Sequence, residues 1–229
     1  NLLFDCDVTN NAQLERLFAS LGEAWPEFDG LVHSIGYAPK EVTQGNVQRI
    51  MYLHVPSVLT AYLAFAVVFV GSLAYLFTQN QKWDDLAAAS AESGVLFTGL
   101  TLVSGSIWGK PTWGTWWTWD ARLTTTAILF VIYLGYLLVR GMVEDPKRGA
   151  RFAAVVGIVG ALNIPIVHFS VVWWRTLHQP STLLGPEPAP ISAPILAALL
   201  VNWVAFTLLY AYFVTKRIRI TRLEAELAA

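Results

Sequence analysis

Charged residues are scarce in this chain. Only 14% of its 229 residues are Asp, Glu, Lys or Arg, whereas about 25% are charged in ordinary soluble domains. So few charges cannot cover the surface of a water-soluble protein in which 55% of the residues are apolar. The 15 basic and 16 acidic residues nearly cancel, so no nucleic-acid partner is expected. The composition predicts an integral membrane protein whose main surroundings are the lipid bilayer.

Cysteine is almost absent as well. Cys6 is the only one in the chain, which excludes an internal disulfide, a CxxC redox pair and a thiolate zinc cluster. The sequence also offers no acid–base pair and no nucleophile–base constellation in a recognisable pattern. We therefore do not expect an enzyme.

Long runs without any charge are the main pattern that is present. A helix needs about 20 apolar residues to cross a bilayer, and roughly 17 are enough. Five runs meet this length: Ile50–Gln81, Ser93–Gly109, Leu123–Val139, Phe152–Trp174 and Pro188–Thr215. A soluble all-α core would need charged outer faces between the runs, and the runs have none. The sequence predicts an all-α integral membrane protein with five transmembrane helices.

The loops between the runs predict the orientation. Five spans place the loop Thr78–Glu92, the loop Arg140–Arg151 and the tail after Thr215 on one side. That side carries Lys82, Arg140, Lys147, Arg148, Arg151, Lys216, Arg217, Arg219 and Arg222, against Lys110, Arg122 and Arg175 opposite. The positive-inside rule puts the basic side in the cytoplasm. Residues 223–229 are then a cytoplasmic tail that extends the last helix, and the Trp-rich segments face outward, to the periplasm of a Gram-negative cell.

The first forty residues follow a different pattern. Leu2–Val8 and Phe28–Ile35 are expected to be strands, and Ala12–Leu21 is expected to be an amphipathic helix. This β-α-β-like order is typical of a soluble doubly wound sheet. A unit of this length cannot bury a core of its own. We interpret residues 1–40 as a separate fragment, without function, that precedes a membrane domain of residues 41–222.

Tryptophan is concentrated between the second and third runs. Five lie within twelve positions, Trp108, Trp113, Trp116, Trp117 and Trp119, and Asp120 follows them. An interfacial aromatic belt is the simpler reading, but this cluster is denser than a belt requires. We predict an aromatic platform for a large planar ligand, with indole N–H groups as polar handles. Gly109 and Gly114 would let the backbone turn beneath it, and Asp120 would hold it by hydrogen bonds to the backbone or to Arg122.

Two histidines are expected at the same outward level. His54 lies near the outward end of the first span, and His178 lies just beyond the fourth. Two imidazoles that flank an aromatic plate can provide both axial ligands of a haem iron. Four cations at that level are candidates to pair with haem propionates: Arg49, Lys110, Arg122 and Arg175. His168, inside the fourth span, is expected to be a hydrogen-bonded structural residue, and His33 is given no role.

These residues carry a resemblance to known families. WGTWWTWDARLT resembles the "WWD" signature of haem-handling membrane proteins of cytochrome c biogenesis. Within that superfamily, QGNVQRIMYLHVP, SGSIWGKPTWGTWW, NIPIVHFSVVWW and TLHQPST are similar to the haem exporter protein C family, from about residue 40 to residue 222. The segment from Asp5 to Glu41 resembles instead an internal stretch of NAD-dependent enoyl-acyl-carrier-protein reductases, without their Gly-rich phosphate loop and catalytic Tyr/Lys pair. There Asp7 and Ser34–Pro39 would match the cofactor site.

The resemblance to the haem exporter family implies a function. It implies six spans, a b-type haem bound by His54 and His178, and a WWD loop at Trp113–Asp120. It also implies haem transfer to a membrane-anchored haem chaperone, with ABC-transporter subunits and a small membrane subunit of the cytochrome c maturation system. The site would face the periplasm from the bacterial inner membrane. The first of six spans would precede Gln44, where the reductase-like segment stands, so we expect a chimera joined near Gly36–Pro39.

Two other functions stay open at this point. A membrane transporter of another planar or lipid-like ligand would use the tryptophans as an interfacial belt. It predicts that replacing His54 or His178 leaves ligand binding intact. A remnant of an enoyl reductase would instead bind nicotinamide, although the motifs for that chemistry are missing.

Overall fold

The computed structural model describes residues 12–13, 15–16, 19–20, 49–178 and 191–227. The chain forms two compact units, Asn1–Tyr37 and Ala38–Ala229. In the first unit, the described residues between 12 and 20 are helical, within the helix expected at Ala12–Leu21. The strands expected at Leu2–Val8 and Phe28–Ile35 lie outside the described residues. Within the part of the chain that is described, no residue is in a strand.

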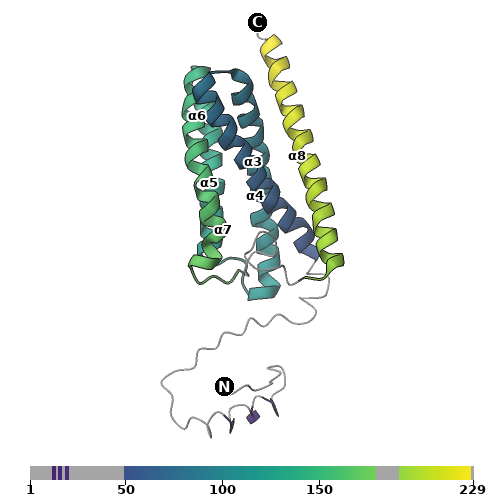
Figure 1. Ribbon diagram of the computed structural model, residues 1–229. Helices are drawn as coiled ribbons and strands as arrows, with labels where there is room; N and C mark the ends of the chain where they lie inside the picture. The colour runs from purple at the N-terminus through teal and green to yellow at the C-terminus, as the bar shows by residue number, and fades with distance from the viewer. Residues whose placement is uncertain (1–11, 14, 17–18, 21–48, 179–190, 228–229) are drawn as a thin grey trace. The chain divides into compact units, whose positions relative to one another are not determined.

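The second unit is a helical bundle (Figure 1). Its helices are α3 Met51–Thr78, α4 Gln81–Trp113, α5 Ala121–Met142, α6 Pro146–Ala161, α7 Asn163–Trp173 and α8 Ala193–Leu227. Because α6 and α7 together form one span, five helical segments are long and apolar enough to cross a membrane. The predicted all-α integral membrane fold with five spans is confirmed.

The predicted loop at Thr78–Glu92 is wrong. Only Gln79 and Asn80 separate α3 from α4, and the Asn80 side chain accepts a hydrogen bond from the backbone N–H of Lys82. An asparagine in this position satisfies one of the N–H groups that a helix start leaves unpaired. The second span is therefore a helix of 33 residues and not the short segment that its charge-free run predicted.

Ion pairs allow charged residues to lie within these helices. Asp84 on α4 is buried and binds Arg140 of α5 through both carboxylate oxygens. Glu92, also on α4, accepts hydrogen bonds of 2.8 and 2.9 Å from Nε of Arg217 on α8. A paired charge costs far less to bury than an isolated one, so α4 continues through residues that ended its predicted span. The helical extension predicted after Thr215 is confirmed, because α8 runs to Leu227.

The fourth span is broken at Leu162, between α6 and α7. Pro165 lies one turn later. It has no N–H for the carbonyl of residue 161, and its ring would collide with that carbonyl in a continuous helix. Beyond the break, α7 contributes Val167 and His168 to the lining of the bundle's cavity.

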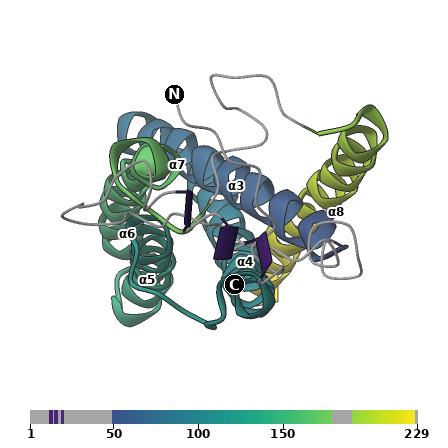
Figure 2. The same cartoon turned by 90° about the horizontal axis from the view of Figure 1, so that it is seen from below.

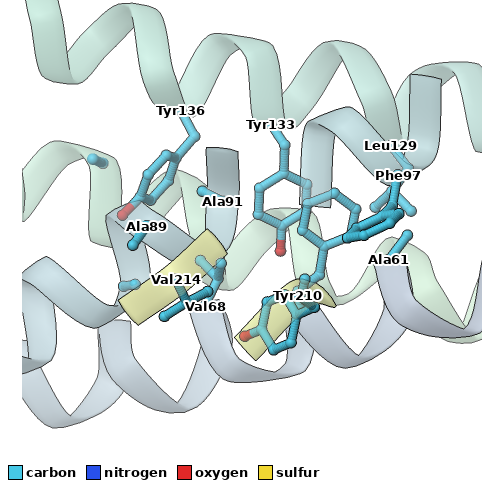
Figure 3. Packing of buried hydrophobic residues seen from close by; sticks show 14 of the residues in the cluster. Ala61, Val68, Ala89, Ala91, Phe97, Leu129, Tyr133, Tyr136, Tyr210 and Val214 are labelled. Atoms are coloured by element: carbon cyan, nitrogen blue, oxygen red, sulfur yellow. The ribbon is translucent and has the colours of Figure 1, made fainter. Parts of the chain in front are cut away.

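The helix α3 crosses the bundle diagonally. Its C-terminal part lies beside α6, and its N-terminal part lies beside α8 (Figures 1 and 2). In the middle of the bundle Phe65 of α3 stacks on Tyr133 of α5, with ring centroids 3.7 Å apart. The Tyr133 hydroxyl donates a hydrogen bond to the carbonyl of Gly157 on α6. Tyr136 and Val68 continue this packed core (Figure 3), which occupies the bundle between its two ends.

Candidate functional site

A cavity lies between α3, α4, α5 and α7, at the end of the bundle where α3 and α5 begin and α4 and α7 end. Most of its lining is apolar or aromatic. Its deepest residues are Ala61, Thr98, Leu129 and Val167, each at most 3% exposed. The stacked Phe65 and Tyr133 belong to the core next to this floor. The cavity is therefore a pocket at one end of the bundle, with a well-packed base.

His54 and His178 face each other in this cavity. His54 is in the first turn of α3 and is 8% exposed, and His178 follows the end of α7. Their ring centroids are 6.4 Å apart and their planes are inclined by 33°. Two imidazoles bound to opposite sides of one metal atom, with metal–nitrogen bonds of about 2 Å, have centroids about 6 Å apart. The spacing thus fits a pair of axial ligands.

In each of the two imidazoles Nδ1 has a polar partner, and the partners differ. Nδ1 of His54 lies 3.1 Å from Oγ of Ser104, and Nδ1 of His178 lies 3.3 Å from Nη1 of Arg122. A metal-binding histidine is commonly fixed by a hydrogen bond at its other nitrogen. Because a guanidinium only donates, Nδ1 of His178 accepts in this arrangement. The proton of neutral His178 is then on Nε2, so metal binding at Nε2 requires Arg122 to move away.

Arg122 joins the third span to the fourth. From the first turn of α5, its Nε donates to the carbonyl of Val167 at 3.3 Å and its Nη2 donates to the carbonyl of His168 at 3.1 Å. Its side chain also lines the cavity. The other three predicted cations are not part of the lining. Lys110 donates to the carbonyl of Gly114, and Arg49 and Arg175 are exposed.

The predicted tryptophan platform is divided between the cavity and the surface. Trp108, Trp113 and Trp117 line the cavity, while Trp116 and Trp119 are 56% and 79% exposed and lie outside the lining. Two of the cavity tryptophans contact the histidine rings. Trp108 lies edge-on to His54 with centroids 5.8 Å apart, and Trp113 lies edge-on to His178 at 6.1 Å.

One of these indoles has an unused donor. Nε1 of Trp117 is buried and has no hydrogen-bond partner. A buried donor without a partner costs about 1–3 kcal/mol. The spacing of the two imidazoles and the mostly apolar and aromatic lining fit a planar ligand that carries a metal.

The turn that ends α4 depends on Gly114. Its φ of 76° is in the left-handed region, and its N–H bonds to the carbonyl of Lys110 to end α4. The same role predicted for Gly109 is wrong, because Gly109 lies within α4. A Cβ there would be 3.1 Å from Cε3 of Trp113, so this glycine makes room for the indole instead.

Asp120 accepts two hydrogen bonds from backbone N–H groups that lie outside the predicted platform. Its Oδ1 accepts from the N–H of Leu123 at 2.8 Å and caps α5, and its Oδ2 accepts from the N–H of Leu177 at 3.1 Å. One carboxylate thus ties the start of α5 to the residue before His178.

Some cavity residues were not predicted from the sequence. His168 was expected to be structural, yet it lines the cavity beside Phe169, whose ring it meets edge-on at 5.0 Å. Tyr62 of α3 also lines it, one turn below Val58. Ser104 contacts His54 across 50 residues of sequence, a separation at which periodicity carries no signal. Within residues 49–178 and 191–227 and the few described before them, no three His, Cys, Asp or Glu side chains are grouped to hold a metal ion.

Comparison with known proteins assigns the chain to a family. The profile of the family described as Heme exporter protein C matches residues 14–229. Proteins named Heme exporter protein C from Bradyrhizobium diazoefficiens and Haemophilus influenzae are 44% and 39% identical to the chain. These matches cover 76% and 86% of the chain and 66% and 80% of the relatives. A ccmC-like mitochondrial protein of Marchantia polymorpha, named for cytochrome c biosynthesis, is 43% identical over 66% of the chain and 63% of its own length.

The match with this family covers parts of both units of the chain. The chain spans just under two thirds of two of these relatives. The family profile begins at residue 14, inside the segment of residues 1–40 that was expected to be a separate fragment. Both the helical unit and most of that segment lie within the match, and the chain therefore belongs to the Heme exporter protein C family.

Proposed function

We propose that this protein binds b-type haem at the outer face of a bacterial inner membrane and delivers it to a membrane-anchored haem chaperone for c-type cytochrome biogenesis. The observation that carries the proposal is the pair of imidazoles, His54 and His178, that face each other across an apolar cavity. The names of the relatives, which refer to haem export and to cytochrome c biosynthesis, support it. The protein acts as a carrier and not as an enzyme.

The cavity residues divide the work of holding haem. Haem supplies an iron with two axial positions, which suits two neutral imidazoles. His54 and His178 would take those positions, and Trp108, Trp113 and Trp117 would pack against the macrocycle. Trp116, Trp119 and Asp120 complete the platform at its exposed rim, where the chaperone would reach the haem edge.

Arg122 has a second role in this proposal. A guanidinium forms stronger hydrogen bonds with a carboxylate than with a neutral imidazole. A haem propionate in the cavity would compete for Arg122 and free Nδ1 of His178. His178 could then lose its Nε2 proton to water and take up a proton at Nδ1, which would leave Nε2 for the iron. Arg49, Lys110 and Arg175 would meet a propionate only at the rim, since they are not part of the cavity lining.

The surroundings of the protein follow from its charges and its family. The basic ends of the helices, at Arg140–Arg151 and after Thr215, lie in the cytoplasm, so the cavity opens to the periplasm. Partners are the haem chaperone, ABC-transporter subunits and the small membrane subunit of the cytochrome c maturation system. Residues 41–222 form the haem-handling domain and residues 223–229 the cytoplasmic tail.

For residues 1–40 we propose an origin from an enoyl reductase by fusion near Gly36–Pro39; the family profile, which already matches from residue 14, is the observation that this fusion must account for. Sequencing reads across that junction in the source DNA test it. Reads in which a continuous family-type first helix replaces this segment would overturn the fusion.

The haem proposal is tested by the visible absorption spectrum of the detergent-purified chain. The parent is expected to show six-coordinate low-spin haem, and His54→Ala and His178→Ala are each expected to turn it high-spin or to lose it. His168→Ala is the critical comparison, because its ring lines the same cavity. Loss of the low-spin spectrum in that variant alone would refute the assignment of the ligands.

Two further outcomes separate the alternatives. A folded parent chain that binds haem equally well without either histidine would favour a carrier of another planar or lipid-like ligand. If the parent is haem-free, the chain with a family-type first helix restored is measured next. A folded but haem-free protein there would refute haem binding.

A further inference from the structure

The His54 ring rests on the neighbouring helix α4 and not on its own helix. Oγ of Ser104 lies 3.1 Å from Nδ1 of His54, and both atoms are buried. The next residue, Gly105, leaves the space that the ring occupies. A Cβ at Gly105 would lie 2.9 Å from Cε1 of His54 and 3.4 Å from its Nδ1. Ser104 and Gly105 together form a seat for the imidazole.

The direction of the hydrogen bond follows from the other contacts of Ser104. Its Oγ lies 2.6 Å from the carbonyl oxygen of Leu100 and 3.3 Å from that of Thr101. A carbonyl only accepts, and a hydroxyl has one proton to donate. That proton goes to Leu100, the usual back-bond of a serine within a helix. Toward His54 the hydroxyl is therefore the acceptor, and Nδ1 of His54 is the donor.

This assignment determines which nitrogen can bind a metal. A neutral imidazole carries one proton, so a protonated Nδ1 leaves the lone pair on Nε2. Of the two ring nitrogens, Nε2 is also the one farther from Gly105, 3.9 Å from the position of an added Cβ against 3.4 Å for Nδ1. Removing the hydroxyl takes away the acceptor that Nδ1–H uses in this contact, while the hydrogen bond of the ring to the backbone of Thr101 remains.

We propose that Ser104 and Gly105 are positioning residues for His54, which hold its ring as the Nδ1–H tautomer and direct Nε2 into the cavity. The inference rests on the proposed function, because it takes His54 as an axial ligand. The inference also implies that His54 and His178 differ in how ready they are to bind iron. His54 is arranged for iron before haem arrives, whereas His178 is held by a donor, Arg122, that must first release it.

The first test needs no haem. The full chain labelled with [15N]histidine is measured in detergent micelles, and long-range 15N–1H spectra report which nitrogen carries the proton. The His54 signals are identified by their loss in His54→Ala. The parent is expected to show a protonated Nδ1 at His54. Ser104→Ala is expected to shift His54 toward the Nε2–H form.

A matched control is Ser93→Ala. Ser93 is also buried on α4 and bonds to the carbonyl four residues earlier, that of Ala89, at 3.1 Å, but it is outside the cavity lining. It should leave the His54 signals unchanged. If His54 keeps a protonated Nδ1 in Ser104→Ala, or if the parent already shows Nε2–H, the proposal is overturned.

The second test measures haem binding by equilibrium titration. Loss of a residue that orients a metal ligand typically weakens metal binding by about 10- to 100-fold, so Ser104→Ala should raise the Kd for haem by that factor and increase the high-spin fraction. Ser104→Thr keeps the hydroxyl and should recover most of the affinity. Gly105→Ala should also become more high-spin, because the added methyl group displaces the ring.

The outcomes separate this inference from the proposed function. If His54→Ala binds haem as the parent does, the proposed function fails. If binding depends on His54 but Ser104→Ala has the Kd and spectrum of the parent, only the positioning role is refuted. Circular dichroism of each variant checks its fold, and the tautomer measurement on Ser104→Ala decides the question even if Gly105→Ala does not fold.

Discussion

Replacing Asp84 by asparagine should destabilise the end of the bundle opposite the cavity. Asp84 is 2% exposed and binds both terminal nitrogens of Arg140, whose side chain is 26% exposed. The asparagine amide could still accept one hydrogen bond but would leave the guanidinium charge without its counterion. Removing one partner of a buried ion pair typically costs 3–5 kcal/mol. Because Arg140 is partly exposed, we expect the lower end, about 3 kcal/mol.

The assay is reversible unfolding of the chain in dodecylmaltoside micelles by added SDS, followed by helical circular dichroism. Asp85→Asn is the matched control, since Asp85 is the next residue on α4 and accepts one exposed hydrogen bond from Gln81. Asp85 is half-buried and is near enough to Arg140 to interact with its charge, but it is not the partner of Arg140 in the ion pair, so its replacement should cost less stability than that of Asp84. The Kd for haem should be the same in both variants, because the cavity lies at the other end of α4.

A double-mutant cycle with Arg140→Gln isolates the pair itself. Each single substitution should cost about 3 kcal/mol, and the double substitution should cost less than their sum by about 1 kcal/mol or more, because contacting residues couple by 0.5–3 kcal/mol. If Asp84→Asn loses no more stability than Asp85→Asn, or if the two losses simply add, the ion pair does not stabilise the bundle and the reasoning is refuted.

Three further outcomes are expected. Gly94→Ala should lower the SDS unfolding free energy by about 1–3 kcal/mol, because an added Cβ would collide with the ring of Phe65; an unchanged value would contradict the tight packing there. Asp120→Ala should cost about 1 kcal/mol through loss of the α5 cap and should also weaken haem binding, whereas an equal Kd would show that the link to the segment after α7 is unimportant. Trp117→Phe should raise the Kd for haem more than Trp119→Phe, since Trp119 is 79% exposed; fluorescence-quenching titration compares them, and the reverse order would refute the division of the platform.

Much of the fold could be read from the charge pattern. The spans α3 and α5 begin and end within three residues of their charge-free runs, and the α6–α7 span ends within one residue of its run but begins six residues before it. The runs locate the spans because an unpaired charge is too costly in the bilayer core. The predicted bounds of the second span were wrong because the charges near its start are paired. Asp84 and Glu92 lie within α4, each with an arginine partner from another helix, and such pairing cannot be seen along a single chain.

The candidate site was predicted in part. His54, His178 and Arg122 were selected from their expected level in the membrane, and the structure brings all three into one cavity. Arg49 and Lys110 were selected by the same criterion and are not part of the lining. Level along the membrane normal follows from the sequence, but the rotation of each helix about its axis does not, and that rotation decides which residues of a given level face inward.

The sequence by itself determined that this protein lies in a lipid bilayer, the number of its spans and the family that it resembles. These properties depend on composition and on the order of residues, since each helix must satisfy its own backbone hydrogen bonds in lipid. Only the tertiary structure decided that three of the five tryptophans line the cavity, that Arg122 holds His178, and that Ser104 and Gly105 seat His54. Each of these contacts joins residues of different helices or loops, and their geometry is set by how the helices pack against one another.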